Sequence, residues 1–495
     1  MAFNPDFMSR LQHRLSTPIS NASLLFFRVV FGVLMLFHVW HEFSSGNIEH
    51  VWVMPQIHFT YTGFGWLPHL PGVGYYVLFG ILFVCGLLIT VGLYFRTAAA
   101  VYFVVWSYVF LSAAAAYQNH FYLICLISAL LMFMPASHSF SLDVYFGRVN
   151  RSRTAPIWSI LMLRLQFAIL YFFGGLAKIN SDWMAGHPVD LWLSRRTDYF
   201  LIGPYTSEPW LTDFISWGGL TLDLIAAPLL FWKRTRLAAF LVTAAFHVTN
   251  NWLFDIGIFP WFMIFGTLVF FDPDWPLQLA KKFRTSRLGF VLGMGEHKPA
   301  TKTPGLIHAP IQGPAKPQIS QLVQVQPGIN ELGKEVIPQT ISSFGVAIIG
   351  LYIVLQVFLP LRHHEYPGNT SWSEEGHFFA WRMMLQDKRV VSQQIEIVSD
   401  HSSEPKRVVL RDYFEMWQAE NMLQSPDLIR QFANHLKEEE QRRGARNVEV
   451  KVDVLISLNG REPQQLIDPT TDLASKDRTI APADWIVPLT TPQQE

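Results

Sequence analysis

The chain has 495 residues, of which 50% are hydrophobic and 15% are charged. Soluble domains usually carry about 25% charged residues. The composition, with its apolar residues grouped in long blocks, therefore excludes an ordinary soluble protein and indicates an integral membrane protein. The chain has 38 basic and 38 acidic residues, so it carries no excess of positive charge. We therefore expect the protein to contact the lipid bilayer and not to bind nucleic acid.

Blocks of about 20 apolar residues, the length that crosses the hydrocarbon core, predict nine membrane helices. The first follows basic residues but no small-residue cleavage site, so we expect it to be retained and not removed as a signal peptide. The nine blocks lie near residues 24–41, 73–94, 98–116, 121–135, 157–177, 215–232, 237–253, 257–271 and 343–359.

Basic residues cluster in alternate turns between these blocks. Cytoplasmic loops retain Lys and Arg, so this alternation places the N-terminus in the cytoplasm and the C-terminal region outside it. The basic residues are Arg10, Arg14, Arg96, Arg148, Arg151, Arg153, Lys233, Arg234, Arg236, Lys281, Lys282, Arg284 and Arg287.

The composition divides the chain into four parts. A transmembrane bundle is expected over 1–287, and a ninth membrane helix over 343–360. Between them, residues 288–342 are rich in Pro, Gln, Gly and Lys, which is typical of a flexible linker, here cytoplasmic. Residues 361–495 form an extracytoplasmic domain.

This last part is expected to be a mixed α/β domain. Asn459-Gly460 tolerates positive φ and predicts a type I′ hairpin turn between two strands. The predicted fold class is thus a polytopic α-helical membrane bundle with a C-terminal mixed α/β domain. The expected elements are strands at 389–399, 405–411, 448–458 and 462–467 and a charged amphipathic helix near 425–443.

Lys178 ends the predicted span 157–177 and has no obvious charge partner in the sequence. A lysine at this depth either extends its charge into the interface, which is common, or loses its proton and acts as a base. Its apolar neighbours, Phe172 and Phe173 among them, would desolvate the amine and favour the neutral base.

Several polar residues are expected at the same membrane depth as Lys178. Polar groups within a membrane often line a cavity, although amides and imidazoles also hold helices together by hydrogen bonds. The predicted set is Asn119, His120, His247, Asn250 and Asn251.

Other polar residues in the spans have simpler interpretations. Arg28 and Arg164 are expected to pair with a buried carboxylate, of which Asp223 is one candidate, or with backbone carbonyls. His38 and His41 lie one helical turn apart but have no third ligand at a suitable spacing, so no metal site is predicted.

Several segments resemble the vitamin K-dependent γ-glutamyl carboxylases. The most specific is Tyr171-Phe-Phe-Gly-Gly-Leu-Ala-Lys178-Ile-Asn-Ser-Asp-Trp183, which is similar to the catalytic-lysine segment of that family. The similarity continues in order along nearly the whole chain and includes segments typical of bacterial members. These further segments are 106–111, 119–123, 246–251, 254–259, 369–372, 379–384, 456–459 and 467–469.

The resemblance implies an enzyme that couples two reactions. Reduced vitamin K is oxidised by O2 to its epoxide, and a peptide glutamate takes up CO2, supplied as CO2 or bicarbonate, to become γ-carboxyglutamate. It assigns Lys178 as the base and His120, with Asn119, as the group that holds the hydroquinone oxygens. His247, Asn250 and Asn251 would complete this cofactor wall.

The resemblance also implies a protein or peptide substrate that contains glutamate, with Trp372 and Arg382 as its candidate ligands. A bacterial inner membrane is the expected location. The chain lacks cysteines that match the family's inter-domain disulfide, so docking of the outer domain is expected to rely on packing. Two alternatives stay open: a quinol epoxidase without productive carboxylation, and a non-catalytic membrane scaffold that binds a quinone.

Overall fold

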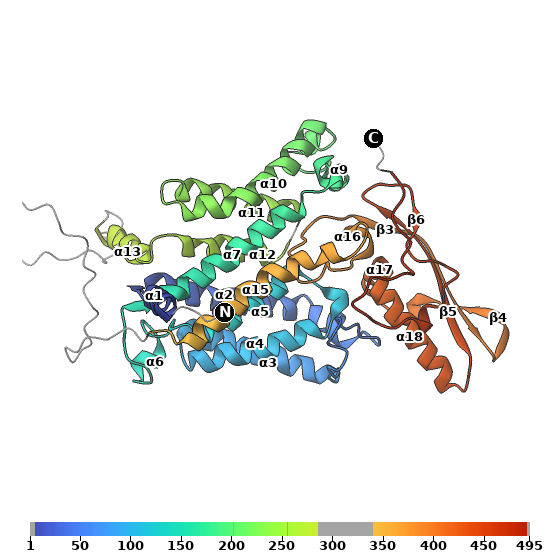
Figure 1. The fold of residues 1–495 in the computed structure, drawn as a ribbon, viewed down its shortest axis with the longest axis horizontal. Helices are drawn as coiled ribbons and strands as arrows, with labels where there is room; N and C mark the ends of the chain where they lie inside the picture. Colours follow the sequence, from blue (N-terminus) through green and yellow to red (C-terminus); the bar gives the residue numbers. More distant parts are fainter. Residues whose placement is uncertain (1–4, 201, 255, 286–339, 493–495) are drawn as a thin grey trace, which may run out of the picture.

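The computed structural model describes residues 5–200, 202–254, 256–285 and 340–492. A bundle of long helices is joined at one end to a C-terminal α/β domain (Figure 1). The predicted linker lies almost entirely outside the described residues.

Every predicted apolar block overlaps one helix of the bundle. The helices are α2 (Ala22–Ser44), α3 (Gly72–Val91), α4 (Phe95–Leu111), α5 (Asn119–Leu131), α7 (Ile157–Ala177), α10 (Pro209–Phe231), α11 (Arg236–Phe254), α12 (Phe259–Thr267) and α15 (Ser343–Leu361).

The count of nine spans is not confirmed. Among the described residues, six helices are long and apolar enough to cross a membrane, namely α2, α3, α7, α10, α11 and α15. The helices α4, α5 and α12 are apolar but shorter, with α5 only 13 residues long. A span needs about 20 residues, and the chain turns irregular before these three reach that length.

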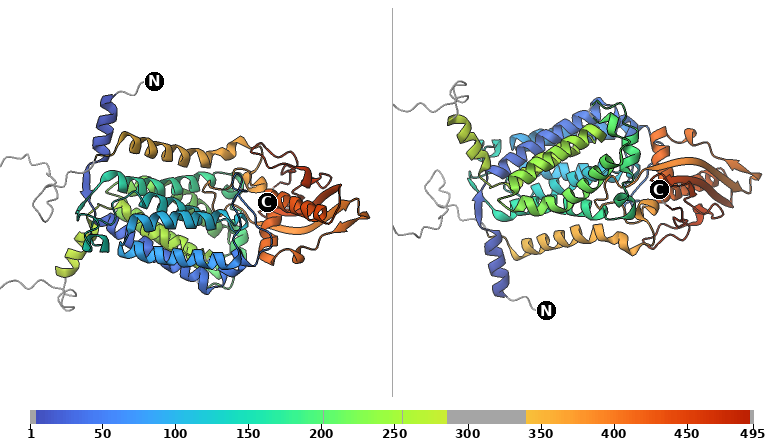
Figure 2. Two further views of the ribbon diagram at one scale, coloured as in Figure 1. Left: turned by 90° about the horizontal axis from the view of Figure 1, so that it is seen from below. Right: turned by 90° about the horizontal axis from the view of Figure 1, so that it is seen from above.

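Short elements lie at the two ends of the bundle. The helices α1 (Pro5–Leu15) and α13 (Trp275–Thr285) lie at the end away from the C-terminal domain (Figure 2). A small sheet pairs β1 (Pro18–Ser20) with β2 (Thr154–Pro156). The remaining short helices are α6 (Leu142–Tyr145), α8 (Ser181–Met184), α9 (Val189–Ser194) and α16 (Thr370–Ser373).

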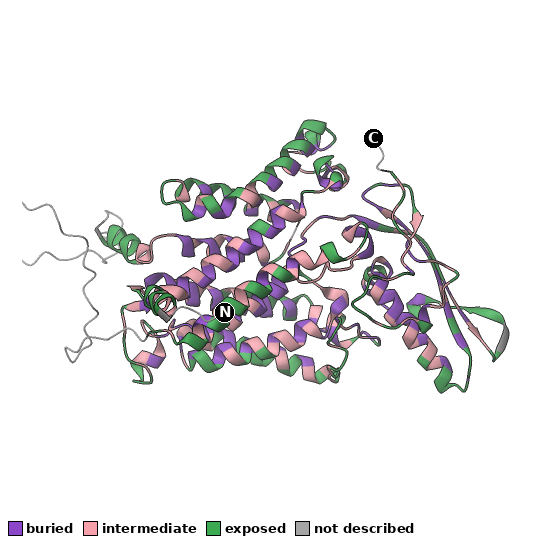
Figure 3. Cartoon of the chain, viewed as in Figure 1, coloured by how far each residue is buried: buried purple, intermediate pink, exposed green. Residues whose placement is uncertain are grey.

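Buried side chains concentrate where the helices of the bundle face one another, whereas α15 has few buried residues (Figure 3). α15 packs on the bundle through apolar side chains, among them Ile349 and Val357, and the Gln356 amide donates to the Tyr122 hydroxyl at 2.9 Å. An exposed apolar helix of this kind is suited to contact lipid.

Within the described part of the chain, the two arginines inside the spans donate to backbone carbonyls and to no carboxylate. Arg28 donates to the carbonyl oxygens of Ala136 at 3.1 Å and Phe140 at 2.9 Å, and Arg164 donates to the carbonyl of Val269 at 2.8 Å. The prediction that Asp223 could pair with one of these arginines was wrong. Carbonyls left free beyond helix ends accept the charge without the cost of burying a carboxylate.

The C-terminal domain is an antiparallel sheet of order β4-β3-β5-β6 that packs on α17 (Met416–Gln424) and α18 (Pro426–Arg442). Alternate residues of β5, from Val448 to Leu458, are buried, which is the period of a strand with one face on the core. The strands are β3 (Lys388–Ser399), β4 (Ser402–Arg407), β5 (Val448–Leu458) and β6 (Gln464–Gln465).

Most of the predicted elements of this domain are confirmed. Asn459 and Gly460 both have positive φ, 52° and 79°, as a type I′ turn requires. The strand predicted at 405–411 starts earlier and ends at Arg407, since the 3-10 turn Leu410–Asp412 follows. The strand predicted at 462–467 shrinks to two residues.

The C-terminal domain packs on the bundle in one continuous hydrophobic core, as expected, and a buried ion pair joins the two parts as well. Arg461 donates to both carboxylate oxygens of Asp182, at 2.7 and 2.5 Å. The Asn459 side chain donates to the same carboxylate at 2.8 Å. The hairpin turn therefore clamps the segment that follows Lys178.

Candidate active site

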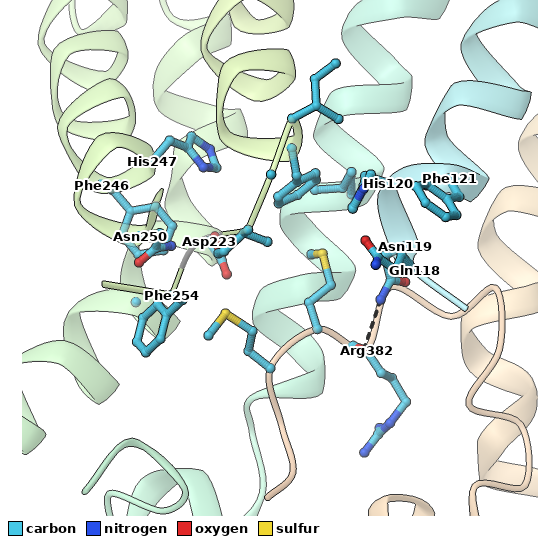
Figure 4. Close-up of a pocket in the computed structure, with 18 of the residues that line it drawn as sticks. Gln118, Asn119, His120, Phe121, Asp223, Phe246, His247, Asn250, Phe254 and Arg382 are labelled. Carbon is cyan, nitrogen blue, oxygen red and sulfur yellow. Dashed lines mark hydrogen bonds between the residues drawn. The ribbon is translucent and has the colours of Figure 1, made fainter. Parts of the chain in front are cut away.

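A cavity of about 560 Å³ lies in the bundle at the end nearest the C-terminal domain. It collects most of the polar residues predicted from the sequence, since Lys178, Asn119, His120, His247 and Asn250 all line it. Figure 4 shows how His247 and Asn250 on one side, Asp223 near the middle and His120 on the other face this space.

Lys178 has a charge partner that the sequence did not reveal. Its Nζ donates to Asp223 Oδ2 at 2.7 Å and to the Gly174 carbonyl at 3.2 Å, and it lies 5.1 Å from the ring centroid of Trp183. Both side chains of the ion pair are more than nine-tenths buried. The lysine therefore does not extend into solvent, and the expectation of an amine without a charge partner is wrong.

Helix packing explains why these two groups meet. Lys178 caps α7, while Asp223 comes from the middle of α10. Gly175 lies at their interface, where an added Cβ would be 2.9 Å from the backbone nitrogen of Leu224. The missing side chain lets α10 approach α7 closely enough for the pair to form.

A second polar pair holds His247. The Tyr171 hydroxyl lies 2.8 Å from His247 Nε2, and both side chains are buried. The ring centroid of Phe259 lies 6.0 Å from that of His120 and 6.1 Å from that of His247. Aromatic walls therefore fix the orientation of both imidazoles.

Asn119 is tied to the C-terminal domain. Its oxygen accepts from the Tyr117 hydroxyl at 3.1 Å, and its amide donates to the Arg382 carbonyl at 3.3 Å. The backbone N–H of Phe379 in turn donates to Tyr117 at 2.8 Å. The predicted hydroquinone ligand thus also aligns residues 379–384 with the cavity.

His38, which the sequence suggested only as a possible metal ligand, also lines the cavity. His38 Nδ1 lies 3.6 Å from Glu42 Oε1, and its Nε2 is buried without a hydrogen-bond partner among the residues that the structure describes. Within the described ranges, no group of three or more His, Cys, Asp or Glu residues is arranged to hold a metal. The (i, i+4) spacing of His38 and Glu42 was a signal for this pair.

Three predicted site residues are placed differently from the rest. Asn251 does not line the cavity, because each helical residue is rotated by about 100° from the one before it. Trp372 is buried in the C-terminal domain, where its Nε1 donates to the Val487 carbonyl at 2.7 Å. Arg382 reaches the cavity, but its side chain points away from the labelled histidines (Figure 4).

The cavity wall from the C-terminal domain is conformationally strained. Phe379, Trp381 and Met384 have φ between 53° and 61°, which is unfavourable for residues with a Cβ. Such strain persists only where the surroundings hold it, and it clusters at functional sites. Here it places Met383 and Met384 against the cavity.

The arrangement combines a buried acid–base pair, two immobilised imidazoles and aromatic walls. Such a space accepts a flat apolar ring with polar substituents and can move a proton at its rim.

Comparison with known families matches this architecture in two parts. Residues 16–275 match the HTTM domain, and residues 341–492 match the lumenal domain of vitamin K-dependent gamma-carboxylase. The first part defines a multi-pass membrane protein of the HTTM class. Together the two parts show that the chain belongs to the vitamin K-dependent gamma-carboxylase family, which confirms the resemblance found in the sequence. No solved structure matches the chain.

Proposed function

We propose that the protein carboxylates peptide glutamate in a reaction that consumes reduced vitamin K, O2 and CO2 and releases the vitamin K epoxide. The buried Lys178–Asp223 pair in the wall of an aromatic cavity carries this proposal. Family membership supports vitamin K-dependent carboxylation, and the cavity adds a site for proton abstraction.

The residues present fit a hydroquinone. The volume of about 560 Å³ falls within the 300–1,000 Å³ usual for small-molecule sites. Phe121, Phe254 and Phe259 offer apolar faces to a ring, and the imidazole of His38 has a free nitrogen. When bound, reduced vitamin K supplies an acidic hydroxyl and the electrons that reduce O2.

Asp223 decides how Lys178 can act as a base. An ammonium held by a carboxylate cannot accept a proton, but the pair can also exist as a neutral amine beside a carboxylic acid. A buried low-dielectric site penalises the two separated charges. We infer that Asp223 retains the proton and leaves Lys178 free to take one from the substrate hydroxyl.

His120, His247 and Asn119 hold the oxygens of the ring in this scheme. Groups fixed before the reaction stabilise a developing phenolate without the cost of reorienting. The Tyr171 hydroxyl positions His247 through their 2.8 Å contact. Asn250 completes the polar wall from α11.

The same proposal gives the protein a sidedness. The basic turns at the α1 and α13 end favour the cytoplasmic face, which leaves the C-terminal domain and the cavity on the extracytoplasmic side, in keeping with a bacterial inner membrane. Peptide substrate would then arrive from outside, and the quinone from the bilayer.

Purified protein in nanodiscs tests the function directly. Reduced vitamin K, O2, labelled bicarbonate and a glutamate peptide are supplied, and epoxide and peptide label are followed together. We expect both products from the wild type and from Lys233→Ala, which removes an exposed lysine at the other end of the bundle, and neither product from Lys178→Ala.

Each other outcome has a definite meaning. Epoxide without peptide label supports the quinol epoxidase, and neither product from folded wild type supports the scaffold. Lys178→Ala leaves Asp223 buried without its partner, so Lys178→Ala/Asp223→Asn is the charge-balanced companion. Full turnover by that double variant would refute Lys178 as the base.

A further inference from the structure

Two carboxylates line the cavity of the candidate site, and the proposed reaction uses one of them. Asp223 pairs with Lys178. The other is Glu42, near the end of α2, with 6% of its surface exposed. Among the described residues, no Lys or Arg lies within ion-pair distance of Glu42. A buried carboxylate without a fixed cation is costly, so its place in the cavity wall needs an explanation.

An imidazole lies beside this carboxylate. His38 precedes Glu42 by one helical turn, and its Nδ1 is 3.6 Å from Glu42 Oε1. Both residues line the cavity, and His38 Nε2 is the buried nitrogen that has no hydrogen-bond partner in the described ranges. Leaving a buried polar nitrogen unpaired costs free energy. The nitrogen is therefore available to a water molecule or a ligand oxygen.

Aromatic rings hold the His38 imidazole next to His120. Its ring centroid lies 5.2 Å from that of Trp106, 5.5 Å from that of Phe121 and 6.4 Å from that of His120. A water molecule or a ligand oxygen can bridge two imidazoles at such a separation. Glu42, His38 and His120 thus form a row of groups that exchange protons. Rows of Asp, Glu and His side chains carry protons in membrane proteins.

One end of this row lies close to the surface of the bundle. α2 ends at Ser44, two residues after Glu42. The segment that follows contacts the C-terminal domain, where His50 pairs with Glu415 at 3.3 Å. His41, which precedes Glu42, lines the cavity and is exposed. The row therefore connects the buried cavity with the end of the bundle nearest the C-terminal domain.

The proposed reaction produces a proton that needs such an exit. When O2 converts the hydroquinone to its epoxide and water, the water takes up the equivalent of both hydroxyl protons. Replacement of a glutamate γ-proton by CO2 then releases one surplus proton for each glutamate. Lys178 and Asp223 are both more than nine-tenths buried. A proton that stays on this pair would therefore block the next turnover.

We propose that His38 and Glu42 form a relay that carries the surplus proton from the cavity to the outer surface. This rests on the proposed function for the origin of the proton. His38 Nε2 takes the proton from a water molecule or ligand oxygen, whose O–H electron pair stays on the oxygen. The proton on Nδ1 then passes to the Glu42 carboxylate and from there to water. The imidazole becomes neutral again, and no electron is transferred.

The first test follows proton movement without turnover, so it stands even if the proposed reaction does not occur. The probe is 2-methyl-1-naphthol, a phenol with the ring shape of the hydroquinone, bound to protein in nanodiscs under argon. Stopped-flow absorbance records how fast the bound naphthol loses its proton after a jump to higher pH, with empty nanodiscs as the blank. We expect Glu42→Gln to slow this step by about tenfold or more, and added imidazole, a small proton carrier, to restore it.

Three variants separate the relay from general effects. Glu49→Gln is the control, because Glu49 follows α2 closely but does not line the cavity and accepts from the Tyr76 hydroxyl at 2.6 Å. Its proton transfer should be as fast as that of the wild type. Glu42→Asp keeps the carboxylate and should be slowed less than Glu42→Gln. If thermal unfolding shows that Glu42→Gln does not fold, His38→Gln carries the test and should be equally slow.

A turnover arm uses the same variants with reduced vitamin K, O2, labelled bicarbonate and a glutamate peptide. In Glu42→Gln the first turnover should keep its rate, whereas later turnovers slow by about tenfold and recover with imidazole. A structural defect would slow the first turnover too and would not respond to imidazole, which would overturn the relay.

The two arms distinguish the relay from the proposed function. Slow proton transfer in Glu42→Gln with no product from the wild type supports the relay and overturns the proposed function. Product from the wild type with no effect of Glu42→Gln in either arm overturns the relay and leaves the proposed function intact. If neither the naphthol nor the turnover responds to Glu42→Gln, the relay is wrong.

Discussion

The Arg461 guanidinium of the C-terminal domain donates hydrogen bonds to both carboxylate oxygens of Asp182. Asp182 belongs to the bundle and comes shortly after Lys178 in the sequence. The pair is buried, with side chains 7% and 4% exposed. It thus fixes the end of α7 to the hairpin turn at Asn459, and it links the position of the candidate base to the docking of the C-terminal domain.

Arg461→Met should loosen this docking strongly. Removing one partner of a buried ion pair typically costs about 3–5 kcal/mol, because the other charge stays buried and unpaired. The melting temperature in nanodiscs should fall by several degrees, and proteolysis between the domains should become faster. Arg443→Met is the control, since its ion pairs with Glu439 and Glu440 are half-exposed and surface pairs contribute little to stability. Equal effects of both variants would contradict a specific clamp.

The same pair predicts a loss of stability in acid. Burial alone would raise the pKa of the Asp182 carboxyl. Hydrogen bonds from Arg461 and Asn459 outweigh this effect and bring the pKa of Asp182 below its ordinary value. A carboxyl with a depressed folded-state pKa stabilises the protein above the unfolded pKa, about 3.9, and this contribution is lost as the pH falls through the lower folded pKa. The melting temperature of the wild type should therefore drop more steeply below about pH 4 than that of Asp182→Asn/Arg461→Met. Parallel curves would contradict the assignment.

Asp223→Asn tests the proton-retaining role proposed for Asp223. Asparagine keeps the size and a hydrogen bond to Lys178 but can no longer hold the proton of the pair. Lys178 can still accept a proton, but the ammonium that it forms then has no carboxylate beside it, and we expect vitamin K epoxidation to fall by about 10²-fold or more, in the range of a lost general-base contribution. The measurement is the initial rate of epoxide formation by the variant and the wild type at one pH, and an undiminished rate in the folded variant would contradict the role.

Tyr171→Phe tests how His247 is held. The variant removes one hydroxyl, and the net contribution of a hydrogen bond is about 1 kcal/mol. We expect roughly a fivefold loss of epoxidation with little change in melting temperature. Tyr102→Phe is a matched control, since the buried Tyr102 hydroxyl has no hydrogen-bond partner in the described ranges of the chain. A larger loss from Tyr102→Phe than from Tyr171→Phe would count against the positioning role.

Hydropathy and turn chemistry predicted much of this architecture. Helix positions follow from apolar blocks because a membrane selects for them, and the Asn459-Gly460 turn follows from the need for positive φ. The ion pair that this turn makes with the bundle was not predictable, since Asp182 is distant in sequence from Arg461. Charge pairing failed for the same reason: Asp223 was a plausible partner for any buried cation, and only the packing of α7 on α10 selects Lys178.

The candidate site was predictable in its residue types but not in the directions of its side chains. Topology put His120 and His247 at one depth with Lys178, and the cavity contains all three. The sequence does not show toward which side of the strained segment the Arg382 side chain points. In the structure, Arg382 lines two cavities.

Gly175→Ala should separate the Lys178–Asp223 pair by displacing α10. The new methyl group would lie 2.9 Å from both the backbone nitrogen and Cγ of Leu224, and backbone cannot move aside cheaply. Overpacking of this kind costs about 1–3 kcal/mol, and epoxidation should fall further than stability does, because Asp223 is the residue next to Leu224 on the same helix and would move with it. Gly218→Ala is the control, because Gly218 lies in α10 and a methyl group added there would meet nothing within 4 Å. It should leave activity unchanged and slightly raise stability, since alanine is favoured over glycine in a helix by up to about 1 kcal/mol. Equal activity of the two variants would show that the close approach of α7 and α10 is not what brings base and carboxylate together.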